Sequence, residues 1–190
     1  MAAPTITDVA TLYEGWIDLL KLTLRNPDGS TFTREVEDHG AAVAVLPYDP
    51  ERRVAVLARQ FRAPVVHAGG PDALLEAPAG MLDEDDPAAC ARREAEEEVG
   101  LRLSGLEHVA TVWPCPGVST ERMDLYLAPF AGGDRISAGG GLADENEDIE
   151  VVEMPLTELA GLADGGGIRD LKTLALVQAL RLRHPELFAG

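Results

Sequence analysis

The sequence is poor in cysteine, and its cysteines and histidines lack the spacing of a disulfide framework or a metal site. Two cysteines, Cys90 and Cys115, are too few for a disulfide framework and lack the spacing of a zinc site. We expect both to be packing residues, because a reduced cysteine behaves as a small hydrophobic side chain. The histidines show no metal-binding spacing either, and we interpret them as surface or structural residues: His39, His67, His108 and His184.

Positive charge is also scarce. Lysine and arginine together number 16 against 33 acidic residues, which gives a formal net charge of -17 at pH 7. This charge opposes contact with nucleic-acid phosphates and anionic membrane surfaces, so we expect neither partner. No apolar run approaches the roughly 20 residues of a membrane helix, and the first ten residues lack a basic signal segment, so we expect a cytoplasmic protein.

The length of 190 residues predicts one domain with a small N-terminal arm. Alternating apolar residues over 16–25, the turn Asn26-Pro27-Asp28-Gly29 and the run 30–36 predict a β-hairpin. We therefore divide the chain into an arm over residues 1–38 and a main domain over 39–190. The strands expected in the main domain lie at 41–46, 54–57, 74–78, 109–112, 124–127 and 150–154, with a loop over 64–73.

Two helices are expected in the main domain. Asp86 suits an N-cap, Pro87 suits the first turn, and Gly100 is placed to end the first helix after Val99. The second helix, over 170–183, has amphipathic spacing. Strands alternating with two helices predict an α+β fold, in which a mixed β-sheet is sandwiched between helices.

The first helix carries a ridge of glutamates. Glu94, Glu97 and Glu98 occupy positions i, i+3 and i+4, so their carboxylates share one face. Like charges at this spacing each cost a helix roughly a few tenths of a kcal/mol unless a cation binds there. The other interpretation of such a run is a solvated acidic face. The residues opposite are small and would pack closely on a sheet: Ala88, Ala91, Ala95 and Val99.

Residues 79–83 and 93–101 together resemble the Nudix box, a glycine loop followed by an Arg-Glu-x-x-Glu-Glu-x-Gly helix. The loop is one residue shorter than is usual in that family, and Asp85 stands where the family has a glutamate. Segments similar to nucleoside diphosphate sugar hydrolases are 59–62, 76–80, 116–121, 140–149 and 168–173. The short loop, Cys90 within the box and the 168–173 segment are similar to the GDP-mannose hydrolase branch. The resemblance implies that 39–190 is a Nudix hydrolase domain.

This resemblance also implies a metal site built from hard oxygen ligands. The implied ligands of Mg²⁺, or of Mn²⁺ in its place, are the Ala79 carbonyl, Glu94, Glu98 and Glu147. Glu97 would complete the cluster, and Arg93 would orient the glutamates. Either Glu147 or Glu145 would act as the general base on the attacking water.

The implied substrate contacts include two cations and one aromatic residue. Arg62 would bind the diphosphate, and Lys172 would bind a phosphate or sugar oxygen. Trp16 would stack on the base. Each has a plainer interpretation, namely a surface arginine, an exposed helix lysine and a core tryptophan. The other implied substrate residues are Arg34, Glu35, Gly80, Met81, Glu121 and Asn146.

The reaction that the resemblance implies is Mg²⁺-dependent hydrolysis of a nucleoside diphosphate sugar, with GDP-mannose giving GMP and mannose 1-phosphate. ADP-ribose is the alternative substrate, and a non-catalytic nucleotide-sugar sensor is the alternative of another class. The family further implies a homodimer joined through the N-terminal hairpin. The run Gly139-Gly140-Gly141 does not end in Lys-Ser/Thr, so we interpret it as a flexible lid hinge and not as a phosphate loop.

Overall fold

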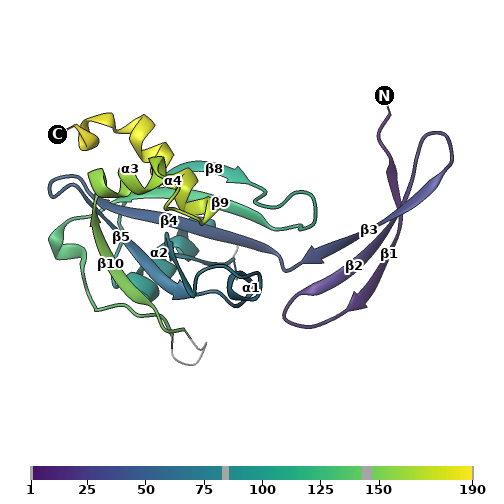
Figure 1. Cartoon of the computed structure of the whole chain (residues 1–190), viewed down its shortest axis with the longest axis horizontal. Coiled ribbons are helices and arrows are strands. Elements are labelled where there is room, and N and C mark those ends of the chain that lie inside the picture. Colours follow the sequence, from purple (N-terminus) through teal and green to yellow (C-terminus); the bar gives the residue numbers. More distant parts are fainter. Residues whose placement is uncertain (1, 83–85, 143–146, 190) are drawn as a thin grey trace. The chain divides into compact units, whose positions relative to one another are not determined.

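The computed structural model describes residues 2–82, 86–142 and 147–189. The chain forms two compact units, whose elements are labelled in Figure 1. The first unit comprises residues 1–41 together with 113–123, and the second comprises 42–112 together with 124–190. The first unit therefore includes a segment from the middle of the chain in addition to the N-terminal strands.

The first unit contains a three-stranded antiparallel sheet in the order β1-β2-β3. Its strands are β1 (Thr5–Tyr13), β2 (Asp18–Arg25) and β3 (Thr31–Asp38). The predicted hairpin is confirmed as β2 and β3, whose turn is closed by a hydrogen bond from Asn26 N to Ser30 O. β1 was not predicted. Every residue of β1 is exposed, so the strand lacks the buried face that gives a strand its alternating pattern.

The second unit is built on a seven-stranded sheet. Its strands are β4 (Ala41–Asp49), β5 (Val54–Phe61), β6 (Ala73–Glu76), β7 (Ala79–Met81), β8 (Glu107–Val112), β9 (Arg122–Pro129) and β10 (Glu150–Pro155). The main path is β10-β5-β4-β9-β8, with β6 beside β5 and β7 beside β4. β5 and β10 are antiparallel. Phe130 N, just after β9, donates to Tyr48 O at the end of β4. The C-terminal ends of β4 and β9 are therefore adjacent. The predicted mixed sheet is confirmed.

Helices cover both faces of this sheet (Figure 1). They are α1 (Ala63–His67), α2 (Pro87–Val99), α3 (Leu156–Asp164) and α4 (Leu171–Arg183). The described residues also include the 3₁₀ turns η1 (Gly132–Asp134) and η3 (Pro185–Phe188). The predicted helices α2 and α4 are confirmed. The Asp86 carboxylate caps α2 by accepting from Ala88 N at 3.0 Å, and Gly100 ends it with a left-handed backbone at φ 68°. The expected loop over 64–73 was partly wrong, because α1 occupies its beginning.

The main core lies between α2 and one face of the sheet. Val43, Val45 and Val56 are fully buried in it. The α2 residues that pack there are Cys90, Ala91, Ala95 and Val99, with Ala88 partly buried beside them. The small-residue face predicted for this helix is therefore confirmed. Residues that alternate with the valines, such as Leu46, point to the opposite face, which α3 and α4 cover.

The two cysteines differ in environment. Cys90 is fully buried in the core, as predicted. The prediction for Cys115 was wrong, because this residue is exposed in the connection between β8 and β9, which offers no core face. Within the described residues, no helix has both the length and the apolar character to cross a membrane.

Candidate active site

The three glutamates of α2 are shielded from water to very different degrees. Glu98 is 1% exposed and Glu94 is 8% exposed, while Glu97 is half-buried. An ionised carboxylate is stable in such surroundings only where a cation or a set of hydrogen-bond donors compensates its charge. A solvated acidic face is therefore excluded for Glu94 and Glu98.

The environment of Glu98 shows which groups meet at its carboxylate. The pKa of Glu98 is raised to about 8, first by burial and then by the negative charges of Glu94 and Glu147. Ala79 N donates to Glu98 Oε2 at 3.3 Å, and this hydrogen bond and the charge of Arg62 oppose the rise. Glu98 of α2 therefore lies within electrostatic reach of Glu94 on the same helix and of Glu147 after the glycine run.

Arg93 ties two of the glutamates together. Its Nη1 lies 2.9 Å from Glu94 Oε1 and donates to Glu97 Oε2 at 3.1 Å. Its Nη2 lies 3.4 Å from the sulfur of Cys90. The Cys90 thiol in turn donates to the Met81 carbonyl at 3.2 Å, so α2 and β7 are also joined at this point. A guanidinium between two carboxylates fixes both of their orientations.

Gly80 is required by the close approach of β7 to α2. A Cβ on Gly80 would lie 2.2 Å from the carboxyl carbon of Glu94, far inside van der Waals contact. Any side chain at this position would therefore displace Glu94. The adjacent Ala79 and Met81 are held by antiparallel pairing of β7 with β4.

The glycine run is fastened to the last turn of α2. Gly140 N donates to Glu98 O at 2.9 Å, and Gly141 N donates to Glu97 O at 3.2 Å. Beyond the run, Leu142 N donates to Glu147 Oε2 at 3.0 Å. The hinge interpretation of 139–141 was therefore wrong, because the helix carbonyls that lack intrahelical partners anchor this segment. Gly141, at φ 78°, also leaves room for Glu147, whose Oε2 would lie 2.6 Å from an added Cβ.

These residues fit a magnesium ion. In the described parts of the chain, no group of three His, Cys, Asp or Glu side chains is arranged to hold a metal ion by itself. Mg²⁺ does not require one, since it usually binds one or two carboxylates and completes its coordination with water and substrate phosphate oxygens. Glu94 and Glu147 disfavour the ionisation of Glu98, and a divalent cation between them would reverse that effect.

Arg62 and Lys172 meet on a second buried glutamate. Arg62 donates from Nε and Nη2 to the two oxygens of Glu76, at 2.8 and 2.9 Å. Lys172 Nζ donates to Glu76 Oε2 and, at 3.1 Å, to Asp170 Oδ1. The Lys172 side chain is only 11% exposed, so the exposed-lysine interpretation was wrong. Arg62 is likewise not an unpaired surface arginine.

Comparison with known proteins identifies the family. Residues 38–177 match the family model described as the NUDIX domain. The chain belongs to the Nudix hydrolase family. Among curated relatives, the GDP-mannose pyrophosphatase of Cronobacter sakazakii is 43% identical over 163 residues, or 85% of this chain and 84% of that protein. The GDP-mannose pyrophosphatase of Citrobacter koseri is 40% identical over 84% of this chain and 83% of that protein.

The fold of this Nudix hydrolase also matches a solved structure. The crystal structure of an ADP compounds hydrolase superposes with a TM-score of 0.79, over 98% of this chain and 96% of that one, at 20% identity. At this identity the likeness establishes the fold alone. The fold class expected from the sequence is confirmed.

Four of the expected substrate residues of the Nudix hydrolase lie in its first unit. Trp16 is 84% exposed and stacks on His39 with ring centroids 6.0 Å apart, so the core interpretation of Trp16 was wrong. Arg34 covers the Phe32 ring at 4.7 Å, and Glu35 is exposed beside it on β3. Glu121 N donates to Ser119 Oγ at 3.1 Å. Glu145, Asn146 and Asp85 lie outside the described residues.

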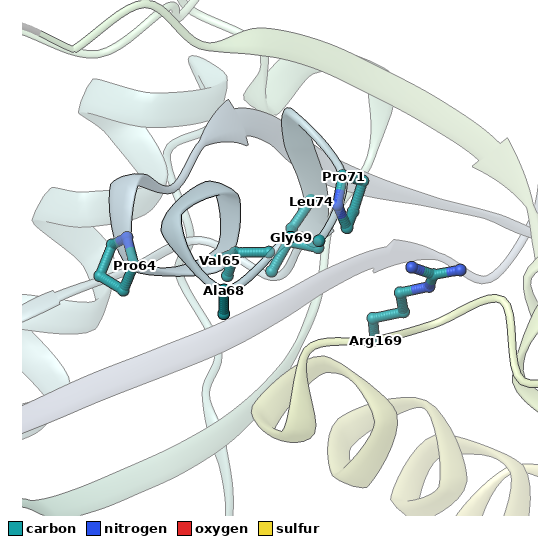
Figure 2. Close-up of a pocket in the computed structure, with 8 residues that line it drawn as sticks. Pro64, Val65, Ala68, Gly69, Pro71, Leu74 and Arg169 are labelled. Carbon is teal, nitrogen blue, oxygen red and sulfur yellow. The ribbon is translucent and has the colours of Figure 1, made fainter.

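One groove of the Nudix hydrolase lies away from the carboxylates. A shallow groove of about 470 Å³ lies beside α1 (Figure 2). Pro64 and Val65 of α1 and Leu74 of β6 line it, and Arg169 reaches it from the segment before α4. No predicted metal ligand lines this groove. Apart from Arg169 the groove is lined by apolar residues and glycines, so it lacks the oxygen ligands that a divalent cation needs.

The sequence did not assign a role to Glu76, although its place in the 76–80 motif is a signal. The partners of Glu76 lie 14 and 96 residues away along the chain, so no local pattern pairs them. Thr173 was missed for the same reason, because Ala77, whose N–H donates to its hydroxyl, lies 96 residues earlier.

Proposed function

We propose that this protein hydrolyses the diphosphate bond of a nucleoside diphosphate sugar with the help of Mg²⁺, and that GDP-mannose is its substrate, giving GMP and mannose 1-phosphate. The observation that carries the proposal is the convergence of Glu94 and Glu147 on the buried Glu98. The GDP-mannose pyrophosphatases at 36–43% identity support the choice of substrate.

Four groups would hold the metal. The proposed ligands are the Ala79 carbonyl, Glu94, Glu98 and Glu147, and Mn²⁺ could replace Mg²⁺ because both accept hard oxygen donors. When bound, the ion supplies positive charge that offsets the charge of the diphosphate. Arg93 keeps Glu94 and Glu97 oriented through the contacts described above. Gly80 leaves the space that the Glu94 carboxylate occupies.

A carboxylate after the glycine run would take the proton from the attacking water. Glu147 is our first choice, because its backbone and side chain both hydrogen-bond to Leu142, which holds the carboxylate near Glu98. Glu145 is the second choice, and Glu97 the third. Positioned carboxylates contribute roughly 10²–10⁴-fold to such proton transfers.

The substrate would be bound by cations and by an aromatic ring. Arg62 would donate to a diphosphate oxygen, Lys172 would contribute its charge beside it, and the exposed Trp16 ring would stack on the base. The other proposed contacts are Arg34, Glu35, Gly80, Met81, Glu121 and Asn146.

We also propose that the protein is a homodimer joined through the first unit. β1 is an edge strand whose large apolar side chains are exposed, namely Ile6 at 59%, Val9 at 56%, Leu12 at 50% and Tyr13 at 61%. Exposed apolar edges invite pairing with another chain, and a second copy would cover this one. Val9→Asp should then shift the sedimentation of the protein toward the monomer, whereas an unchanged dimer would contradict this use of β1.

Product analysis tests the substrate. The purified protein is incubated with Mg²⁺ and either GDP-mannose or ADP-ribose, and release of GMP and AMP is followed by anion-exchange chromatography. We expect GMP to form with the higher kcat/KM. Faster release of AMP would reassign the substrate to ADP-ribose. Tight binding without hydrolysis of any nucleotide sugar, with Mg²⁺ or Mn²⁺, would overturn the proposed reaction in favour of a sensor.

A further inference from the structure

Glu76 is an almost completely buried carboxylate outside the proposed metal site. It is 2% exposed and lies at the end of β6, three residues before Ala79. Both of its oxygens accept from Arg62, and one of them also accepts from Lys172. Such a buried ion pair is seldom the most stable choice, since apolar residues of similar volume often stabilise a fold equally well or better.

The arginine of this network retains donors for a ligand. Arg62 uses Nε and Nη2 on Glu76, and within the described residues no contact of its Nη1 is found. Its side chain is 39% exposed, so a ligand can reach it. The negative charges of Glu98 and Asp170 act on Arg62 in addition to that of Glu76, so the guanidinium lies within electrostatic reach of one proposed metal ligand.

The lysine is fixed in the same network from α4. Lys172 Nζ uses two donors, one on Glu76 and one on Asp170. Asp170 also accepts from Thr173 N at 3.0 Å and from Thr173 Oγ1 at 2.5 Å. Ala77 N donates to Thr173 Oγ1 at 2.6 Å, so the start of α4 is joined to the chain segment that continues to Ala79.

We propose that Glu76 is a positioning residue that holds Arg62 and Lys172 ready for the diphosphate. This inference rests on the proposed function, because it assigns the two cations to the same substrate. Glu76 itself would not touch the substrate.

Two physical effects make this role necessary. Long cationic side chains lose rotational freedom when they bind a ligand, and a partner that fixes them beforehand reduces that cost. Without the Glu76 charge, the two cations would also repel each other in a buried space. Arg62 would then be drawn toward Glu98, the carboxylate whose charge it already feels, and would compete with Mg²⁺ there.

The first test replaces Glu76 by its neutral isostere. Glu76→Gln should raise KM for GDP-mannose and the Kd of GDP, measured by calorimetry with Mg²⁺, by about 10-fold. The kcat should change less than about twofold, because loss of uniform binding affects KM alone. The control is Glu150→Gln, which breaks the exposed ion pair of Glu150 with Arg59 at 3.0 Å on the same sheet and should change neither constant.

A double variant separates positioning from a general structural role. In an Arg62→Met background, Glu76→Gln should lower kcat/KM by much less than it does alone, because its main target is gone. Circular dichroism and thermal unfolding check the fold of each variant. If Glu76→Gln does not fold, Glu76→Asp, which keeps the charge but shortens the side chain, should still raise KM severalfold.

Specific results would overturn the proposal. They are an unchanged KM and Kd in folded Glu76→Gln, a loss in kcat with constant KM, full additivity in the double variant, or a wild-type KM in Glu76→Asp where Glu76→Gln does not fold. In each case wild-type hydrolysis of nucleotide sugars would leave the proposed function standing. Inactive wild-type protein across a nucleotide-sugar panel would instead overturn the proposed function, and this inference with it.

Discussion

Replacing Glu98 by glutamine should abolish most of the activity while the protein stays folded. Glutamine has the same shape, stays neutral and can still accept the hydrogen bond from Ala79 N. We therefore expect Glu98→Gln to fold, to lose its response to Mg²⁺ and to lose at least about 100-fold in turnover. Even partners in the outer shell of metal sites are worth roughly 10–100-fold in affinity or activity.

The pH dependence gives the size of the stability effect. The folded protein raises the pKa of Glu98 from 4.5 to about 8, so it holds a proton that the unfolded chain releases. The metal-free wild type must therefore lose stability as the pH rises from the unfolded pKa toward the folded one, and the loss ends above about 8. Between pH 5.5 and 7.5 the loss amounts to about 2–3 kcal/mol, since each unit is worth about 1.4 kcal/mol. Glu98→Gln has no ionisable group at this position, so its unfolding free energy should not show this decrease.

Urea unfolding in EDTA at a series of pH values measures the effect. The unfolding free energy of Glu98→Gln is subtracted from that of the wild type at each pH, so that the contributions of all other titrating groups cancel. Adding Mg²⁺ at pH 8 should stabilise the wild type and leave the variant unchanged. The control is Glu96→Gln on the exposed face of the same helix, which should follow the wild type throughout.

The reasoning fails if wild type and Glu98→Gln show the same pH dependence in EDTA. It fails equally if Mg²⁺ stabilises both proteins to the same extent, or if the variant turns over at the wild-type rate.

Three further substitutions test the parts of the site. Glu147→Gln should lower kcat by about 100-fold in steady-state assays, as expected for loss of a general base; a nearly unchanged kcat would move that role to Glu145 or Glu97. Gly80→Ala should lower kcat/KM by at least about 10-fold, because its Cβ would lie 2.2 Å from the Glu94 carboxyl carbon, and wild-type activity would show that Glu94 is not needed there. Asp86→Ala removes the cap of α2 and should cost about 1 kcal/mol, or about 2–4 °C in Tm by calorimetry, without lowering activity below the unfolding temperature; an unchanged Tm would contradict the capping role.

Helix α2 could be predicted because its signals are local. Asp86, Pro87 and Gly100 mark its ends, and the alanines mark its packing face. α3 lacked such signals, since Pro155 at its N-cap position offers no capping side chain and Gly161 interrupts it. α1 is five residues long and lies among prolines and glycines that favour a loop.

The candidate site also has features that the sequence predicts and features that it does not. The spacing of Glu94 and Glu98 predicts carboxylates on one side of a helix, and their place in a family motif points to the metal. Neither feature predicts their burial, because burial depends on how β7 and the segment after the glycine run pack against α2. The burial of Lys172 could not be predicted from the sequence either, because its partner Glu76 lies 96 residues away along the chain.

The attachment of the glycine run to α2 limits how this protein can vary. The carbonyls of Glu97 and Glu98 serve as fixed docking points, and their direction depends on the number of residues in the helix. Adding or deleting one residue before them would rotate these carbonyls by about 100° around the helix axis. Insertions and deletions should consequently be excluded between Glu94 and Glu98, because they would turn the carboxylates and the two carbonyls to different sides of the helix.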